Sequence, residues 1–535
     1  MLIDARSLPD GAQLQCDLAV IGAGPAGLGI VDRLRASGLR ICLLEGGGLE
    51  QTVRAQRLYR GEITGHPHYP LHTSRFRVFG GSGNRWGGWC HPLEPIDFEH
   101  RPQLPWSGWP VSAADLDRYN KDTAELLGLT TDDFGSASWR DRLPPGLPIE
   151  GGDFENAIFQ ISPRRDFGGA YRDRLRDSAD VTVVLHANVT ELRLDPGTDR
   201  VGTLRARTLR GNELSVRGRA VVLAAGAIEN ARLLLASRHD RAAGLGNERD
   251  QVGRNFMEHL HVLAGHLVVA NPTTTHDLYR EASYGAARVR GVITPTAEAQ
   301  RREGLLGASI AIEPPTFPYG QPFLTAPPQL TVWPERAYRR LRRSNRGAGA
   351  VVGEGMKGLA RDAWYSTRAT VPRRAARSAR ARAATTGPVA LRALYFRSEQ
   401  PPNPSSRVTL GDRVDALGVP EALLDWRVES AERTSIEAWL ARLDSAVRRG
   451  GIGRVIMPEP GWQEFITSGP HHMGTTRMSA DPAAGVVDRN CRVHSVGNLY
   501  VAGSSVFATG GYANPTFTLL ALALRVADEV RAVLT

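Results

Sequence analysis

The chain has 535 residues, too many for one ordinary hydrophobic core, so we expect two or three domains. Its 41% hydrophobic and 23% charged residues are typical of a soluble globular protein rather than a fibrous or disordered one. The net charge of +10 is uneven, because residues 336–382 hold fourteen basic and two acidic side chains and so carry +12, leaving the rest near −2. The high pI therefore does not indicate nucleic-acid binding by the body of the protein.

The remaining bulk features exclude several other classes. Cys16, Cys42, Cys90 and Cys491 form no CxxC pair or zinc spacing, so we predict no disulfide framework and no metal site. The N-terminus lacks the pattern of a secretory signal, and no apolar run is long enough to span a membrane. We expect a cytoplasmic protein.

Residues 16–45 predict a strand–helix–strand unit. An apolar run over 16–22 ends in glycine, apolar residues at helical spacing fill 26–37, and 39–45 is again apolar. A strand, a glycine turn, a helix and a second strand within about thirty residues are typical of a dinucleotide-binding unit.

The turn of this unit reads Gly22-Ala23-Gly24-Pro25-Ala26-Gly27. The first glycine of such a GxGxxG turn permits a tight bend, the second lets a pyrophosphate approach, and the third lets the helix pack closely on the strand. Glu45 ends the next strand, where an acid suits a ribose diol and would repel the 2′-phosphate of NADP. The turn alone does not choose between FAD and NAD.

The other predicted elements follow in chain order. Residues 60–100 are rich in Gly, Trp, His and Pro and predict extended loop; the patterns predict helices over 112–128, 228–238, 429–450 and 516–533, strands over 181–194 and 218–226, and a sheet-based region over 260–335. The basic insert, 336–386, has a helix-favouring Arg/Ala composition interrupted by glycines. It could be a solvated excursion, a docking surface for an anionic partner, or a lid or subunit contact.

Four blocks resemble one known family. They are residues 16–48, 79–88 (FGGSGNRWGG), 224–234 (AAGAIENARLL), and the run 471–516, which begins HHMGTTRM and ends GSSVFATGGYANPT. The chain resembles the glucose–methanol–choline (GMC) oxidoreductases, specifically the bacterial branch similar to pyranose oxidase. This resemblance implies an α/β fold (α+β overall) with a discontinuous Rossmann-like FAD-binding domain and a sheet-based substrate domain that carries the insert.

The resemblance also implies domain limits and cofactor contacts. The FAD-binding domain is expected over 1–100, 178–265 and 462–535, and the substrate-binding domain over 101–177 and 266–461. The residues expected to contact FAD are Gly22, Gly24, Pro25, Ala26, Gly27, Glu45, Gly81, Ser82, Asn84, Trp86, Gly87, Val189, Ala225, Gly226, Gly503, Ser504, Pro515 and Thr516. Pyranose oxidases bond a His before the loop Trp to the flavin; because Arg85 stands there, we predict non-covalent FAD.

Oxidising an alcohol by hydride transfer to flavin N5 requires a base for the hydroxyl proton, and a neutral His suits this role. The resemblance places the base on the first residue of an HxxGT pattern, His471, and a hydrogen-bonding partner on Asn514, which cannot take the proton. Because neighbouring residues of an extended segment point in opposite directions, His472 is expected to pack elsewhere. We expect His259, His261 and His494 to be structural, with the FMEH segment helping to shape the site.

The sequence therefore predicts an FAD-dependent oxidoreductase that converts a hydroxyl of a sugar, glycoside or aminosugar-type substrate to a carbonyl. An aminoglycoside-pathway oxidase acting on a primary hydroxyl, a non-redox lyase on the same fold and a non-catalytic flavin scaffold are the alternatives. The electron acceptor could be oxygen, a quinone or another compound, and a homo-oligomer is compatible with the sequence. No nucleic-acid partner is expected.

Overall fold

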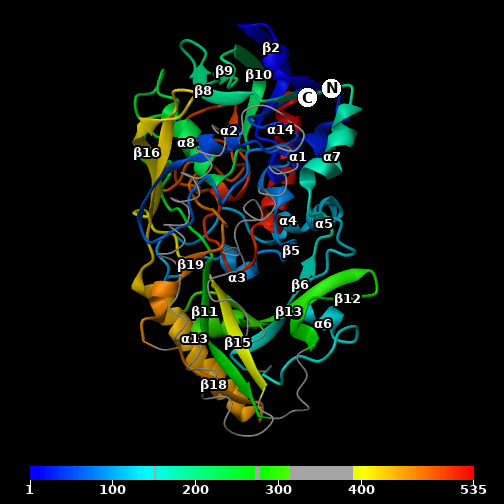
Figure 1. The fold of residues 1–535 in the computed structure, drawn as a ribbon, viewed down its shortest axis with the longest axis vertical. Coiled ribbons are helices and arrows are strands. Elements are labelled where there is room, and N and C mark those ends of the chain that lie inside the picture. Colours follow the sequence, from blue (N-terminus) through cyan, green and yellow to red (C-terminus); the bar gives the residue numbers. More distant parts are fainter. Residues whose placement is uncertain (150–151, 271–276, 314–389, 459) are drawn as a thin grey trace, which may run out of the picture.

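A computed structural model describes residues 1–149, 152–270, 277–313, 390–458 and 460–535. The basic insert, 336–386, lies outside the described residues. Two sheets occupy opposite ends of the long axis of the molecule, and both chain termini lie at the end of the first sheet (Figure 1). A third, small sheet joins β16 (Arg407–Val414), β17 (Pro420–Trp426) and β4 (Gly61–Gly65).

The first sheet has a parallel core of buried strands. Its order is β1-β7-β3-β2-β10-β9-β8, with β20 paired to the end of β10, and all neighbours from β1 to β10, as well as β20, run parallel. Parallel strands place their carboxyl ends at one edge, where α/β sheets bind ligands. The bounds are β1 (Leu2–Asp4), β2 (Ala12–Ile21), β3 (Ile41–Glu45), β7 (Val181–Leu185), β8 (Asn188–Leu194), β9 (Val201–Arg207), β10 (Glu213–Leu223) and β20 (Leu499–Val501).

Helices from distant parts of the chain pack together beside this sheet. The first, α1 (Pro25–Leu34), starts with Pro at its first position after Gly24 as N-cap, where the missing N–H costs nothing. It packs against α14 (Thr516–Leu534), and α14 in turn packs on α5 (Asn120–Leu127). The other helices of this part are α2 (Val53–Gln56), α3 (Pro95–Phe98), α4 (Ala114–Asp117), α7 (Phe167–Arg176) and α8 (Ala227–Ala236).

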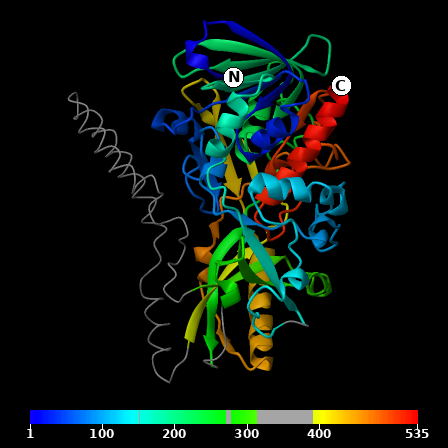
Figure 2. The same cartoon turned by 90° about the vertical axis from the view of Figure 1, so that its right-hand side faces the viewer.

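The second sheet is antiparallel, with the order β18-β11-β15-β14-β13-β6-β5, and α13 (Ser430–Arg449) lies along it (Figures 1 and 2). Near one edge of this sheet β11 (Leu260–Val269) pairs with β15 (Ala390–Ser398). The remaining elements are β5 (Trp89–Cys90), β6 (Phe154–Ile161), β12 (Ala282–Tyr284), β13 (Ala287–Pro295), α9 (Ala297–Glu303), β14 (Ala308–Glu313), β18 (Gly453–Ile456) and β19 (Thr467–Ser468), with α6 (Ser136–Trp139) beside β6.

Two local predictions need correction. The expected strand over 181–194 is broken into β7 and β8, because His186 adopts a left-handed φ of 59°. The expected loop over 60–100 contains β4, β5, α3 and a short 3-10 turn over Gly81–Asn84. The partner of β4 is β17, some 360 residues away, so no local pattern could reveal it. The two-domain boundaries stay a prediction.

No helix in the described part of the chain is both long and apolar enough to cross a membrane.

Candidate active site

Three predicted cofactor segments meet at the carboxyl edge of the first sheet. The glycine turn follows β2, Ala225 and Gly226 follow β10, and Gly503 follows β20. Asn230 joins two of them, since its side chain accepts a hydrogen bond from Ala225 N at 2.8 Å and donates one to Ser505 Oγ at 2.9 Å. The sheet topology therefore assembles residues that lie nearly 480 positions apart.

Open space runs along this edge. A Cβ built on Gly24, Gly226 or Gly503 would meet no protein atom within 4 Å. By contrast, a Cβ on Gly27 would lie 2.0 Å from Gly22 O, which explains why glycine is needed where the helix packs on the strand. Bare backbone beside open space at a helix N-terminus is the arrangement that accepts a pyrophosphate, so these residues fit FAD.

Glu45 ties the glycine turn to its neighbours. Its two carboxylate oxygens accept hydrogen bonds from Ala23 N at 3.0 Å and Gly47 N at 2.6 Å. The backbone N–H of Ala187 donates to Glu45 O, which places Val189, near the start of β8, beside this corner. The predicted FAD contacts Glu45 and Val189 thus lie close together.

The 79–88 loop lies directly on the glycine turn. Gly80 N donates to Ala23 O at 2.8 Å, and a Cβ on Gly81 would come within 3.0 Å of Gly24 Cα. Gly87 is exposed, as expected of backbone that faces a ligand or solvent.

Other side chains of this loop are engaged within the protein. Asn84 donates to Phe79 O and accepts from Gly168 N, both at 2.8 Å, while Trp86 Nε1 donates to Arg164 O at 2.8 Å. Ser82 Oγ accepts a 3.3 Å hydrogen bond from the backbone N–H of Phe76. These hydrogen bonds hold the loop in shape. Any contact of Ser82, Asn84 or Trp86 with FAD must therefore use atoms that are not already engaged in these bonds. Arg85 is exposed.

The C-terminal motif folds so that its two halves lie side by side. Ser504 Oγ donates to His472 O at 2.7 Å, and Gly474 N donates to Ser504 O at 3.1 Å. On the other side, Met473 exchanges backbone hydrogen bonds with Met257. Pro515 caps α14 and Thr516 is its first residue. The predicted histidine segment is therefore held between the FMEH segment and the glycine-rich run.

His471 and Asn514 contact each other, with Asn514 Nδ2 3.0 Å from His471 Nε2. On its other side His471 Nδ1 lies 2.9 Å from His259 Nδ1, and His259 Nε2 lies 3.2 Å from Gly510 O. A carbonyl only accepts, so His259 carries its proton on Nε2 and accepts at Nδ1. The chain of bonds then assigns the proton of His471 to Nδ1 and leaves Nε2 as the basic atom.

The surroundings of His471 keep it neutral. Burial, with smaller contributions from the nearby His259 and Arg397, holds the pKa of His471 well below its usual value. Burial likewise lowers the pKa of His259 to about 4. Asn514 Oδ1 is buried without a hydrogen-bond partner in the described structure, so it is available to a bound molecule.

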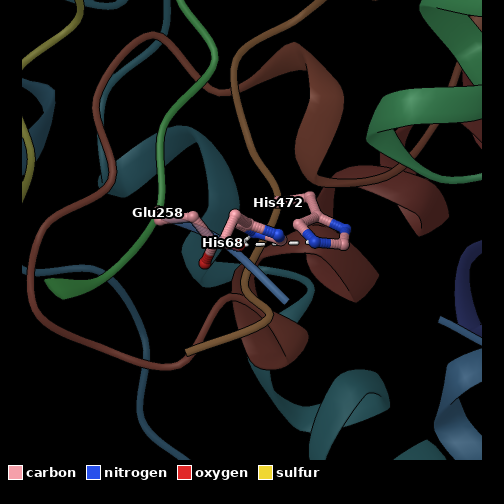
Figure 3. Close-up of side chains that lie close together, drawn as sticks. All are labelled: His68, Glu258 and His472. Carbon is pink, nitrogen blue, oxygen red and sulfur yellow. Dashed lines mark hydrogen bonds and ion pairs between the residues drawn. The ribbon is translucent and has the colours of Figure 1, made fainter. Parts of the chain in front are cut away.

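His472 points to the opposite side, into a cluster with His68 and Glu258 (Figure 3). Glu258 Oε1 lies 3.0 Å from His68 Nε2 and 3.3 Å from His472 Nε2, and Glu258 Oε2 accepts a 2.7 Å hydrogen bond from the backbone N–H of His471. No sequence pattern pointed to a carboxylate beside the two histidines, because Glu258 lies more than 200 positions before them in the chain. Through its bond to the His471 N–H, Glu258 links this cluster to the backbone of His471.

Sequence reasoning also missed residues of the second sheet near His471. The ring of His261 lies 5.7 Å from that of His471, and Tyr395 Oη lies 3.0 Å from His261 Nδ1. Arg397 is directly opposite His261 in the strand register. Residues two apart on a strand share a face, so the pairs 259/261 and 395/397 could have been noticed as patterns, but not placed together.

Two families of known proteins match the chain. Residues 17–243 match the FAD dependent oxidoreductase family, and residues 402–523 match the GMC oxidoreductase family in its C-terminal part. The chain belongs to the GMC oxidoreductase family. It is an FAD-dependent oxidoreductase that acts on CH–OH donors.

Individual GMC relatives are similar over nearly the full length. The chain is 24% identical to 2-methyl-1,2-propanediol dehydrogenase of Mycolicibacterium austroafricanum, covering 96% of this chain and 95% of the relative. It is 25% identical to 6'''-hydroxyparomomycin C oxidase of Streptomyces lividus, covering 98% and 92% respectively. A fungal aryl-alcohol oxidase structure shares the fold with a TM-score of 0.56, at 16% identity over 98% of this chain and 99% of that one.

Proposed function

We propose that this GMC oxidoreductase oxidises a hydroxyl of a sugar, glycoside or aminosugar-type substrate to a carbonyl, with His471 as the base. The observation that carries the proposal is the 3.0 Å contact between Asn514 Nδ2 and a neutral, buried His471 Nε2. FAD, when bound, supplies the hydride acceptor at N5. The similarity to a diol dehydrogenase and an aminoglycoside oxidase supports a polyhydroxylated substrate.

Four residues of the protein have separate roles in the proposed reaction. When substrate binds, its hydroxyl replaces the Asn514 amide as the group bonded to His471 Nε2. His471 Nε2 then accepts the hydroxyl proton, and Asn514 Nδ2 donates a hydrogen bond to the same oxygen and so fixes its direction. His259 accepts from His471 Nδ1–H and holds the imidazole in the tautomer that exposes Nε2. Glu258 fixes the backbone of His471, and the bond between His471 Nδ1 and His259 sets the direction of the ring.

The cofactor assignment is part of the proposal. FAD is held without a covalent bond by the glycine turn 22–27, Glu45, the loop 80–87, Val189, Ala225, Gly226, Gly503 and Ser504, and the start of α14. Support comes from the open space beside Gly24, Gly226 and Gly503. Acid precipitation should release all of the flavin into the supernatant; yellow colour retained in the pellet would contradict non-covalent binding.

The test compares the two adjacent histidines. His471→Ala should lower the anaerobic rate of flavin reduction by orders of magnitude, roughly the 10²–10⁴-fold ascribed to general-base catalysis, while FAD content stays near that of the wild type. His472→Ala is the matched control and should lose much less. The opposite order would overturn the assignment of the base.

An anaerobic assay of flavin reduction can also identify the substrate and the electron acceptor. Sugars, glycosides, aminosugars and simple diols are mixed anaerobically with the wild type, and bleaching of the flavin identifies substrates. Oxygen, a quinone or a dye is then added to find what reoxidises it. A lyase would turn over its substrate without bleaching, so this measurement separates the two reaction classes.

A further inference from the structure

Among the described residues, one arginine beside the histidines has no carboxylate partner of its own. Arg397 lies on β15 directly opposite His261 on β11, and side chains opposite each other on adjacent strands share one face of a sheet. The His261 ring is 5.7 Å from that of His471. The guanidinium of Arg397 therefore lies within the group of residues that surrounds the proposed base.

The immediate neighbours of Arg397 do not neutralise it. Its guanidinium carbon lies 4.1 Å from the centre of the Trp89 ring, and Nη1 is buried with no hydrogen-bond partner in the described part of the chain. The carboxylate that acts on it, Glu313, is hydrogen bonded at 2.7 Å to Arg290 instead. Arg290, Arg397 and Glu313 together leave one uncompensated positive charge.

Among the described residues, most buried arginines are paired with carboxylates, while the buried Arg477 donates to the backbone carbonyls of Ala484 and Trp106. Arg101 binds Glu399, Arg75 binds Glu229, and Arg232 binds Asp415. Arg397 as a residue is half-buried, but its Nη1 is enclosed without a partner, which is costly for a charged group. Burial lowers the pKa of Arg397 to about 10, which still leaves it protonated at neutral pH. An unpaired cation beside the proposed base is explained if the substrate itself carries the negatively charged group that pairs with Arg397.

We propose that Arg397 is an anion-recognition residue and that the substrate is a hydroxylated compound bearing a carboxylate, such as an acidic sugar or its glycoside. The inference rests on the proposed function for the position of the reacting hydroxyl. The planar guanidinium presents paired N–H donors to a carboxylate, and contact with Trp89 holds that plane in place. A polycationic aminosugar would be repelled, so the charge narrows the substrate classes given above.

The first test measures binding without turnover. Cyclohexanecarboxylate and cyclohexanecarboxamide, which carry no oxidisable hydroxyl, are titrated into the FAD-bound enzyme, and the flavin absorbance is followed. The wild type should bind the carboxylate at least about tenfold more tightly than the amide, as expected for a charge-assisted hydrogen bond. Equal affinities would overturn the inference.

Substitutions assign the preference to this residue. Arg397→Met should abolish the carboxylate preference, and Arg397→Lys, which keeps the charge but not the planar fork, should retain part of it. Arg392→Met changes an arginine five positions earlier on the same strand and should keep the full preference. A preference that survives in Arg397→Met would overturn the inference, and FAD content verifies that each variant is folded.

The second test uses turnover. Methyl glucuronide and methyl glucoside differ by a carboxylate, and the ratio of their kcat/KM values for flavin reduction should fall about 10- to 100-fold in Arg397→Met. An unchanged ratio would overturn the role of Arg397. If no compound reduces the flavin while the carboxylate still binds through Arg397, the proposed oxidation of a hydroxyl fails, whereas the role of Arg397 in recognising a carboxylate stands.

Discussion

At the scale of single residues, the proposed chemistry depends on the protonation state of His471. Its pKa is lowered by burial and, to a smaller extent, by the charges of His259 and Arg397. The neutral form is the active base, and it predominates at every pH above the lowered pKa. Acid inactivation through this group should therefore begin well below pH 6.5.

We predict a flat pH profile for the chemical step. The limiting rate of anaerobic flavin reduction should change by less than about twofold between pH 8 and pH 6, because His471 stays deprotonated throughout. A base with the usual pKa of about 6.5 would lose roughly three quarters of its activity at pH 6. Stopped-flow measurement distinguishes these cases, and a loss centred near pH 6.5 would show that the histidine is not shielded.

Single residues also show which parts of the candidate site could be predicted from the sequence alone. His471 and Asn514 were predicted because both belong to blocks with specific local patterns, and the structure brings them into contact. Glu258 and Arg397 were missed, because their roles come from neighbours 213 and 136 positions away in the chain. A buried carboxylate or guanidinium has no local pattern that reveals which distant group it faces.

At the scale of elements, the turn between β2 and α1 contains two glycines with different roles: Gly27 is needed for close packing, and Gly24 is expected to face the cofactor. Gly27→Ala would place a Cβ 2.0 Å from Gly22 O and should destabilise the protein by about 1–3 kcal/mol, as overpacking does. Gly24 has an ordinary φ of −79° and open space where its Cβ would lie. Gly24→Ala should leave the flavin-free protein as stable as the wild type but weaken FAD binding at least about tenfold.

Urea unfolding of flavin-depleted protein and flavin titration measure the two effects separately. Equal FAD affinity in Gly24→Ala and wild type would mean that the open space is not where the cofactor lies. Gly38→Ala would be an unsuitable control because of its positive φ. Gly152→Ala is a suitable one, since its Cβ meets no neighbour and no positive φ is required.

The predicted elements succeeded where the pattern was local. The strand–helix–strand unit, the helix of 430–449 and the final helix were all recognised within a few residues. The errors occurred where pairing was distant or where one backbone angle decided the result. β4 exists because β17 is beside it, and the break between β7 and β8 depends on the left-handed φ of His186.

At the scale of the whole molecule, buried neutral histidines make folding sensitive to acid. Burial is the largest cause that lowers the pKa values of His259, His261, His471 and His472. The unfolded chain therefore binds more protons below about pH 6.5, so the free energy of unfolding falls as the pH falls through this value. Glu258 and Glu432, whose pKa values are raised by burial, oppose the trend in part.

We expect the free energy of unfolding to drop by several kcal/mol between pH 7.5 and pH 5.5, about 1 kcal/mol for each fully buried histidine. Guanidinium unfolding at pH 7.5, 6.5 and 5.5, with FAD in constant excess, measures this loss. His259→Gln, which cannot titrate, should show a shallower dependence than the wild type. A midpoint that is constant or rises toward acid would contradict the prediction.

The order of strands in the first sheet has a consequence for how the protein is made. The expected cofactor edge combines β2 with β20 at Leu499–Val501, and the proposed base is His471. A ribosome releases these parts in sequence, so β2 and α1 emerge long before the segments that complete their binding edge. Contacts of such high sequence separation form slowly. We therefore expect FAD capture to be a late event that follows release of β20 and α14. A nascent chain stopped before β20 would lack both part of the cofactor edge and Asn514, which contacts His471.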